Sequence, residues 1–167
     1  GILMALDPPS ASVTTFRRSL ALSGPMGAGK STVGRLLAER VGVPFADVDL
    51  EIAREATCSV AEIFSREGEV AFRAREAKTI DRLLADQQPR ILSLGGGAVT
   101  HEPTRRALLR QSVLVTLEAP IDDLFARVAP RLGERPLLAR SENPRRTLEQ
   151  LVDARRVAYA EAHARIS

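Results

Sequence analysis

A glycine-rich segment near the start of the chain has the residue types and spacing of a phosphate-binding loop. It fits the pattern G-x-x-x-x-G-K-[ST], with Thr32 next in the chain, and reads Gly24-Pro25-Met26-Gly27-Ala28-Gly29-Lys30-Ser31. Glycines let backbone N–H groups approach phosphate oxygens, and a following helix adds positive charge at its N-terminus. In this motif the lysine reaches the β- and γ-phosphates and the serine binds Mg²⁺. The segment predicts nucleoside triphosphate binding and leaves the phosphate acceptor open.

Two carboxylates follow the next apolar run. Asp47 and Asp49 lie at the end of a strand predicted over 43–48, and alternation along the strand places both on one side. Kinase chemistry needs one carboxylate to position Mg²⁺ and another to orient or deprotonate the attacking hydroxyl. A solvated turn is the alternative, since Asp is common after strands. The phosphate loop upstream favours the chemical interpretation.

An arginine on an apolar helix face is a second candidate. Arg73 falls in line with Ala77, Ile80 and Leu84 on a helix predicted over about 68–86. A buried guanidinium needs an anion, because an unpaired buried charge is costly. The sequence leaves two kinds of partner open, namely a protein carboxylate (Glu69 or Glu76) or a ligand carboxylate.

Two further segments suit contacts with a ligand. Gly95-Gly96-Gly97 closes a predicted strand and lets a ligand reach backbone N–H groups directly, with a plain tight turn as the alternative. Arg135-Pro136-Leu137-Leu138 lies within 129–143, a segment rich in Pro, Gly and Arg that we predict to be a loop. A solvated surface arginine is the alternative for Arg135.

Strand and helix patterns alternate along the chain from about residue 19. Strands are predicted over 19–23, 43–48, 91–94 and 113–117, and helices over 30–41, 68–86, 104–111, 121–128 and 145–164. Ser59 and Glu62 form a capping box at a further helix start. Such alternation predicts an α/β protein with a parallel sheet and helices on both faces. Ligands on these sheets bind at the carboxyl ends of the strands, where the candidate residues lie.

Composition narrows the class of protein. The 167 residues fit one domain and fall short of the roughly 250 that a (β/α)8 barrel needs. With 44% apolar and 27% charged residues the chain is not disordered, and no run approaches the roughly 18 apolar residues of a membrane span. The single cysteine, Cys58, excludes an intrachain disulfide, and with two histidines a zinc cluster is not expected. These features indicate a soluble protein of a reducing compartment.

The net charge of the chain favours binding of small anionic ligands. The formal net charge is +3, and Lys30 and Lys78 are the only lysines among 24 basic residues. A mild positive balance suits anionic small ligands as well as nucleic acid. With one tyrosine and no tryptophan there is little to stack bases on, which counts against single-stranded nucleic acid.

Taken together, these motifs resemble the shikimate kinase family. The phosphate loop, Asp47-x-Asp49, Phe72-Arg73-x-x-Glu76, Leu94-Gly95-Gly96-Gly97-Ala98 and Arg135-Pro136-Leu137-Leu138 occur in the family's order between about Ser19 and Ile166. The resemblance implies a three-layer α/β/α kinase fold with five parallel strands in the order 2-3-1-4-5. It also implies ATP-dependent phosphorylation of the 3-hydroxyl of shikimate to give shikimate 3-phosphate and ADP.

The resemblance assigns roles to individual residues. It implies that Asp49, Lys30 and Arg135 are catalytic and that Ser31 and Asp47 organise Mg²⁺. ATP contacts are expected from residues 24–32, Arg135 and Arg127, with Arg131 as an alternative to Arg127 at the adenine. Shikimate contacts are expected from Asp49, Arg73, Gly95, Gly96, Gly97, Arg155, Phe64, Phe72, Pro136 and Leu137, with Arg156 as the alternative to Arg155. His101 and His163 are expected to be bystanders.

The expected organisation is one domain with an N-terminal arm and an incomplete C-terminal end. Residues 1–18 are predicted to be three added residues ahead of Met4 and a flexible arm, and 19–167 the kinase-like domain with a lid over about 129–143. The family continues with the rest of a fifth strand and a closing helix, so a truncated C-terminal end, or a fusion to another enzyme of the pathway, is expected. A cytoplasmic monomer acting on shikimate and ATP follows from the resemblance. A gluconate kinase and a non-catalytic sensor domain are the alternatives.

Overall fold

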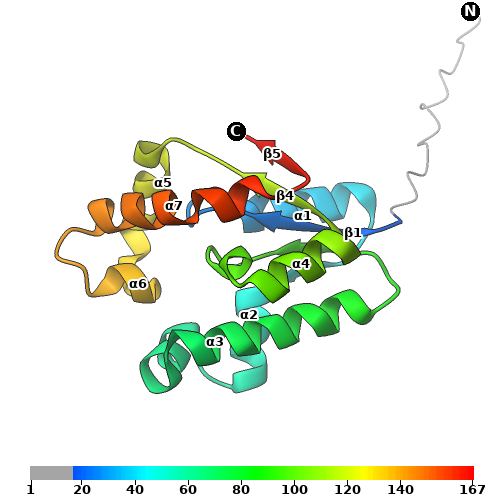
Figure 1. Cartoon of the computed structure of the whole chain (residues 1–167), viewed down its shortest axis with the longest axis horizontal. Coiled ribbons are helices and arrows are strands. Elements are labelled where there is room, and N and C mark those ends of the chain that lie inside the picture. The colour runs from blue at the N-terminus through cyan, green and yellow to red at the C-terminus, as the bar shows by residue number, and fades with distance from the viewer. Residues whose placement is uncertain (1–16) are drawn as a thin grey trace, which may run out of the picture.

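A parallel sheet of five strands forms the centre of the computed structural model, which describes residues 17–167 (Figure 1). The strand order is β2-β3-β1-β4-β5 and every pairing is parallel. The bounds are β1 Ser19–Ser23, β2 Phe45–Asp47, β3 Ile91–Ser93, β4 Ser112–Leu117 and β5 Ala164–Ile166. This confirms the predicted fold class and strand order.

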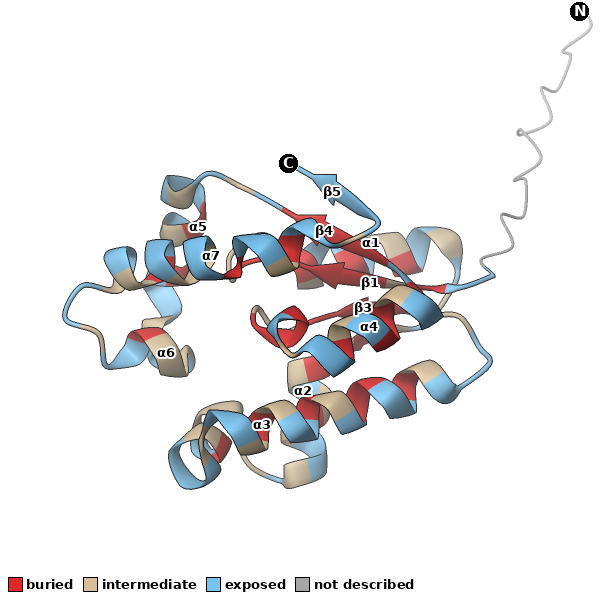
Figure 2. Ribbon diagram, viewed as in Figure 1, coloured by how far each residue is buried: buried red, intermediate tan, exposed pale blue. Residues whose placement is uncertain are grey.

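Helices surround the sheet. The α-helices are α1 Lys30–Val41, α2 Val48–Ala56, α3 Val60–Ala85, α4 Glu102–Gln111, α5 Ile121–Val128, α6 Pro136–Ala139 and α7 Pro144–Ala160. Two 3₁₀ turns, η1 Ala98–Thr100 and η2 Ala129–Glu134, complete the elements. Most residues of the central strands β3, β1 and β4 are buried, with Val113 of β4 exposed, whereas the helices turn exposed faces outward (Figure 2). Strands covered on both faces need apolar side chains throughout, as in Leu20-Ala21-Leu22 and Ile91-Leu92.

Three elements begin and end where the residue pattern predicts. These are β1, α1 and α5, over 19–23, 30–41 and 121–128. The capping box is also confirmed, because the Glu62 N–H donates to the Ser59 hydroxyl (3.1 Å) and the Ser59 N–H donates to the Glu62 carboxylate (3.0 Å).

The predicted strand over 43–48 is wrong at its carboxyl end. The strand stops at Asp47, whose side chain accepts a hydrogen bond from the Leu50 N–H (3.2 Å) and caps α2. Asp is a strong N-cap residue, so the chain turns into a helix where alternation would have continued the strand. Asp49 therefore lies in the first turn of α2 and not on a strand beside Asp47.

Helix α3 joins the segment that begins at the capping box to the predicted helix over about 68–86, and so confirms both. It starts at Val60 and changes direction at Gly68, whose backbone has φ 81° and ψ 176°. A residue with a Cβ rarely adopts this conformation, so glycine is required here. The break divides α3 into two segments, before and after Gly68.

The C-terminal third also departs from prediction. The segment 129–143 contains η2 and α6 and is not simply a loop, with Pro136 at the first position of α6 where its fixed φ suits a helix start. The last helix ends at Ala160 instead of residue 164, and Ala164 opens β5.

Two expectations remain, the N-terminal arm and the absence of a membrane-spanning helix. The predicted arm over 1–18 lies outside the described residues, apart from Arg17 and Arg18. Within residues 17–167, no helix has the length and apolar character needed to cross a membrane.

Candidate functional site

A cleft of about 790 Å³ lies at the carboxyl ends of the strands, where the α/β topology places ligands. Among the predicted ATP residues, Met26, Gly27, Gly29, Lys30, Ser31, Thr32, Arg127 and Arg135 line it. Every predicted substrate residue lines it too, as does Asp47. Gly24, Pro25 and Ala28 belong to the loop but do not face the cleft. The topology thus brings together residues spread over more than a hundred positions of the chain.

Lys30 anchors the phosphate loop from the start of α1. Its ammonium group donates to the carbonyl oxygens of Gly24 (2.7 Å) and Pro25 (3.0 Å). Burial, partly offset by the nearby carboxylate of Asp49, lowers the pKa of Lys30 to about 8. The side chain therefore carries its charge at neutral pH, and its donors are positioned where phosphate oxygens compete with the loop carbonyls.

Oxygen ligands gather beside the loop. The Ser31 hydroxyl donates to a carboxylate oxygen of Asp47 (2.7 Å) and lies 3.0 Å from the Ser93 hydroxyl. Mg²⁺ prefers oxygen ligands and is usually held by one or two carboxylates together with water and substrate phosphates. Ser31 and Asp47 fit such an ion. A cluster of three or more His, Cys, Asp or Glu that would make a fully protein-built metal site is not found in the described part of the chain.

Asp49 lines the cleft and has one carboxylate oxygen without a partner in the described part of the chain. Its Oδ1 atom is buried and has no hydrogen-bond partner among residues 17–167. Burial, and then the charge of Asp47, raise the pKa of Asp49. A carboxylate with a raised pKa is a better proton acceptor near neutral pH, which suits a general base.

Glu76 faces the same point as Asp49. Glu76 Oε2 and Asp49 Oδ1 each lie 2.9 Å from the place that a Cβ on Gly95 would occupy. Glu76 is 1% exposed, and its Oε1 atom accepts from Arg73 Nη1 (2.7 Å). Burial outweighs the charge of Arg73 and raises the pKa of Glu76 to about 7. The sequence considered Glu76 only as an alternative partner of Arg73, and the structure shows that this pair forms.

The ion pair with Glu76 does not use all the hydrogen-bond donors of Arg73. Its Nη2 atom is 3.4 Å from Glu69 and only 2.1 Å from the position of a Cβ on Gly97. Its Nε atom is buried with no hydrogen-bond partner in the described chain. The guanidinium therefore keeps donors for a ligand while one side holds Glu76.

The structure distinguishes Arg155 from Arg156, the two α7 arginines that were alternatives for the second carboxylate contact. Arg155 is 7% exposed and lines the cleft, with Nη2 at 2.9 Å from the same Gly97 Cβ position. Arg156 is exposed and donates to Asp153 (2.7 Å). Arg155 and Arg73 thus converge on one point, and such a pair of forks is suited to hold a carboxylate.

An apolar wall stands beside the charged groups. The rings of Phe64 and Phe72 lie 4.5 Å apart between centroids, one from each segment of α3. Pro136 and Leu137 of α6 also line the cleft. Together these side chains provide a surface for the carbon ring of a small ligand.

The predicted lid contributes arginines. Arg135 lines the cleft, and its buried Nε atom has no partner among the residues described. Arg127 Nη1 donates to the carbonyl of Gly27 (2.8 Å), and Arg131 also lines the cleft. The structure therefore keeps both Arg127 and Arg131 as candidates near the nucleotide.

Sequence reasoning missed several residues that line the cleft. Ser93 ends β3 directly before the triple glycine, and its position at a strand end was the available signal. Leu50 and Ala53 were hidden by the wrong strand boundary, because they face the cleft from α2. His101 and His163 do not line it, and they contact Thr104 and the Leu114 N–H instead.

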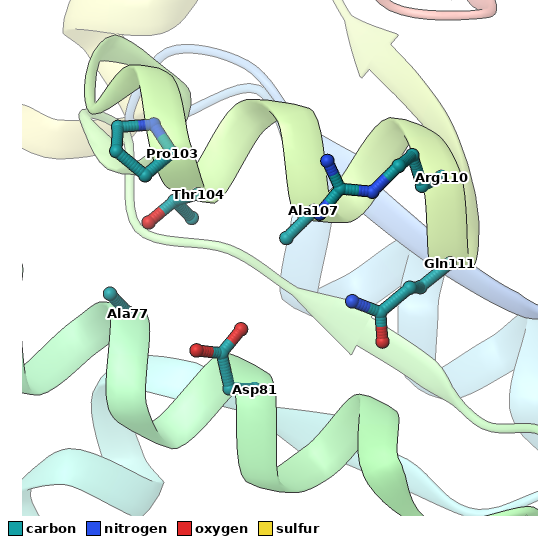
Figure 3. Close-up of a pocket in the computed structure, with 7 residues that line it drawn as sticks. All are labelled: Ala77, Asp81, Pro103, Thr104, Ala107, Arg110 and Gln111. Carbon is teal, nitrogen blue, oxygen red and sulfur yellow. The ribbon is translucent and has the colours of Figure 1, made fainter.

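A second, smaller cavity of about 390 Å³ lies between α3 and α4 (Figure 3). It is lined by Ala77, Asp81, Pro103, Thr104, Ala107, Arg110 and Gln111. None of the predicted site residues belongs to it, so the chemistry expected from the sequence is confined to the larger cleft.

Comparison with known proteins agrees with this geometry. The family model described as shikimate kinase matches residues 26–167. A shikimate kinase from Rhizobium leguminosarum bv. trifolii is 48% identical over 145 residues, which cover 87% of this chain and 72% of that relative.

Solved structures of two kinds of kinase differ in how similar they are to this chain. A shikimate kinase from Acinetobacter baumannii in complex with shikimate has a TM-score of 0.86 and 40% identity, covering 91% of this chain and 84% of that one. A gluconokinase from Sinorhizobium meliloti, with a TM-score of 0.55 and 21% identity, covers 83% of this chain and 74% of its own, and shares the fold alone. The match of sequence, structure and cleft residues leads to one assignment. The chain belongs to the shikimate kinase family.

Proposed function

We propose that this protein is an ATP-dependent kinase that converts shikimate and ATP into shikimate 3-phosphate and ADP. One observation supports the substrate most directly. Arg73 and Arg155 converge on Gly97 beside the phosphate loop, and Asp49 lines the same cleft with one carboxylate oxygen that has no partner in the described chain. A carboxylate on the ligand would satisfy the arginines and a hydroxyl would satisfy Asp49, and shikimate carries both groups.

The transfer itself uses the groups around Asp49. A substrate hydroxyl hydrogen-bonded to Asp49 attacks the γ-phosphorus of ATP, the new O–P bond forms, and the bond to the β,γ-bridging oxygen breaks to release ADP. The hydroxyl proton passes to the Asp49 carboxylate. Lys30 and Arg135 stabilise the negative charge on the transferring phosphoryl group.

Substrate orientation follows from the opposite wall. Arg73 and Arg155 hold the carboxylate, and amides of Gly95, Gly96 and Gly97 contact the hydroxyls. Phe64, Phe72, Pro136 and Leu137 pack against the ring. Holding the reacting atoms in this way lowers the entropic barrier to transfer.

ATP and Mg²⁺ occupy the other end of the cleft. The loop over 24–32 surrounds the phosphates, Arg127 or Arg131 lies against the adenine, and Ser31 and Asp47 hold Mg²⁺. When bound, the ion offsets phosphate charge and orients the γ-phosphoryl group.

The wider setting is part of the proposal. A cytoplasmic monomer acting on two small molecules, without nucleic acid, is consistent with a single cysteine and with few aromatic side chains for base stacking. The lid over 129–143 is proposed to close over ATP and exclude water.

A coupled assay of ADP release tests the function. The protein should release ADP with ATP, Mg²⁺ and shikimate, and not with gluconate in place of shikimate. Asp49→Asn, which keeps the shape and removes the base, should reduce turnover about 10²–10⁴-fold. ADP release that is independent of shikimate, or that occurs only with gluconate, would contradict the proposal. Undiminished turnover by Asp49→Asn would contradict the role of Asp49.

A further inference from the structure

Tyr159 is a buried polar side chain at the edge of the substrate cleft with no role so far. It lies in α7 one helical turn after Arg155, and is 5% exposed. Its ring packs in the main hydrophobic core together with Leu94, Ala98 and Val99, which flank the triple glycine and continue into η1. It is also the only tyrosine of a chain without tryptophan.

Two hydrogen bonds connect Tyr159 to the sheet edge. Its hydroxyl donates to the carbonyl oxygen of Gly96, the central glycine of the triple-glycine segment. Its backbone carbonyl accepts from the Thr116 hydroxyl of β4 (2.8 Å). The first bond links α7 to the ligand-facing loop, whereas the second attaches the end of α7 to the sheet.

Within the described chain Arg155 has no direct acidic partner, although Glu76 lies near enough to interact with its charge. No carboxylate forms an ion pair with Arg155 anywhere in residues 17–167. Arg73 approaches the same Gly97 position, so two like charges converge in a buried site. Glu76, which accepts from Arg73, offsets part of the repulsion between the two guanidinium groups, and packing and dipoles must supply the rest of what holds Arg155 in place.

Tyr159 is placed to supply that support. Arg155 Nη1 lies 3.3 Å from the position of a Cβ on Gly96, the residue whose carbonyl Tyr159 holds. Burial raises the pKa of Tyr159, although the neighbouring Arg155 opposes this, so the hydroxyl keeps the proton that it donates to Gly96. The hydroxyl oxygen has lone pairs left and lies close enough to Arg155 to interact with its charge.

We propose that Tyr159 is a positioning residue for substrate binding, whose hydroxyl holds the Gly96 carbonyl and the Arg155 guanidinium at the spacing that accepts a ligand carboxylate opposite Arg73. The inference rests on the proposed function, since it takes shikimate as the ligand. It assigns Tyr159 an effect mainly on shikimate binding, because its hydroxyl bonds to Gly96 beside Arg155. The phosphate loop approaches Gly96 less closely, with Met26 N and Gly24 O at 3.5 and 3.8 Å from the position of a Cβ on Gly96.

Tyr159→Phe is the direct test, because it retains the ring in the core and removes only the hydroxyl. The loss of one hydrogen bond should raise KM for shikimate about 3- to 10-fold, while kcat and KM for ATP stay within about 2-fold. A purely structural tyrosine would instead lower Tm and leave the two KM values in their original ratio.

Thr116→Val is the matched control, because it removes the other hydrogen bond of the same residue. It should lower Tm without a selective rise in KM for shikimate. A KM for shikimate unchanged in Tyr159→Phe, or raised equally in Thr116→Val, would overturn the inference.

The single tyrosine also offers a direct binding signal. Shikimate titrated without ATP should change the tyrosine fluorescence of the wild type, and gluconate should not. A fluorescence that does not respond to saturating shikimate in an active enzyme would overturn the inference and leave the proposed function intact. A wild type that does not turn over shikimate would overturn both.

Discussion

The two halves of the cleft are built on different physical principles. The nucleotide half consists mainly of loop backbone, one helix N-terminus and arginines such as Arg127 that lie at the surface, with Lys30 as the one buried charge among its site residues. The substrate half consists of charged side chains inside the protein, with Glu76 at 1% and Arg155 at 7% exposure. Backbone geometry of the first kind recurs in kinases with different substrates. Buried charges of the second kind are costly without their ligand, so they encode which ligand it is.

The contrast also separates what each half contributes to catalysis. On the proposed function, the nucleotide half, together with the base Asp49, should determine the rate of phosphoryl transfer, because these groups are the ones proposed to act on the reacting atoms. The substrate half should determine selectivity and should couple binding to burial and pH. Four experiments test that division.

Among these four experiments, the largest effect is expected at the phosphate loop. Lys30→Ala should lower kcat about 10²–10³-fold with little change in KM for shikimate, since the lost charge acts on the transferring phosphoryl group. Lys78, the other lysine, is exposed on α3, and Lys78→Ala should leave the kinetics unchanged. Steady-state assays of ADP release check both. A Lys30→Ala enzyme that fails mainly through KM for shikimate would break the division between the halves.

The next effect is a pH dependence of stability. The pKa of Glu76 is raised to about 7 from its ordinary 4.5, chiefly by burial. Between these pH values the unfolded chain has released the proton that the folded chain still holds, so the free energy of unfolding falls as pH rises through this window. Asp49, Arg73 and Arg155 are the charges around Glu76 that modulate the shift.

Glu76→Gln should remove this fall, which amounts to about 3 kcal/mol. Urea unfolding below, within and above the window measures it. Glu102→Gln, at an exposed carboxylate on α4, should keep the wild-type dependence. A Glu76→Gln protein with the same pH profile as the wild type would mean that Glu76 is ionised throughout.

A pair of arginine substitutions addresses selectivity. Arg155→Ala should raise KM for shikimate about 10- to 100-fold, as expected when a charged hydrogen-bond partner is lost. Arg156→Ala should change it by less than about 3-fold, because an exposed ion pair contributes little. Equal effects of the two substitutions would place the carboxylate site elsewhere.

The smallest effect is expected from glycine-to-alanine substitutions, made once beside the buried arginines and once in the lid. Gly97→Ala places a Cβ 2.1 Å from Arg73 Nη2 and should raise KM for shikimate about 10-fold, as the guanidinium must move. Gly133 lies in η2, where no described atom outside its chain neighbours comes within 4 Å of an added Cβ. Gly133→Ala should leave both KM values unchanged. A larger effect at Gly133 would show that the lid, and not the buried charges, limits substrate binding.

Local patterns predicted the fold well where one physical cause acts alone. The apolar run of β1, the glycine-rich turn and the periodicity of α1 agree with each other, and their bounds are as predicted. The end of β2 failed because two rules compete at Asp47, which can end a strand or cap a helix. The choice depends on the Leu50 N–H, which no short pattern reports.

The site was harder to predict from the sequence than the fold. Sequence spacing indicated that Arg73 needs an anion but could not tell Glu76 from a ligand, and the structure shows that one guanidinium serves Glu76 and still faces the cleft. The distinction between Arg155 and Arg156 depends on burial, which is set by how α7 packs and not by local sequence.

The break at Gly68 has a consequence for the apolar wall of the cleft. In an unbroken helix, residues eight apart are separated by about 12 Å along the axis. Phe64 and Phe72 are eight apart, yet their ring centroids are 4.5 Å apart because the two segments of α3 fold toward each other. The helix break at Gly68 therefore brings the two rings of the apolar wall into contact. A residue with a Cβ at this position would favour a continuous helix, in which the two rings could not meet, so the backbone at Gly68 determines whether this apolar wall forms.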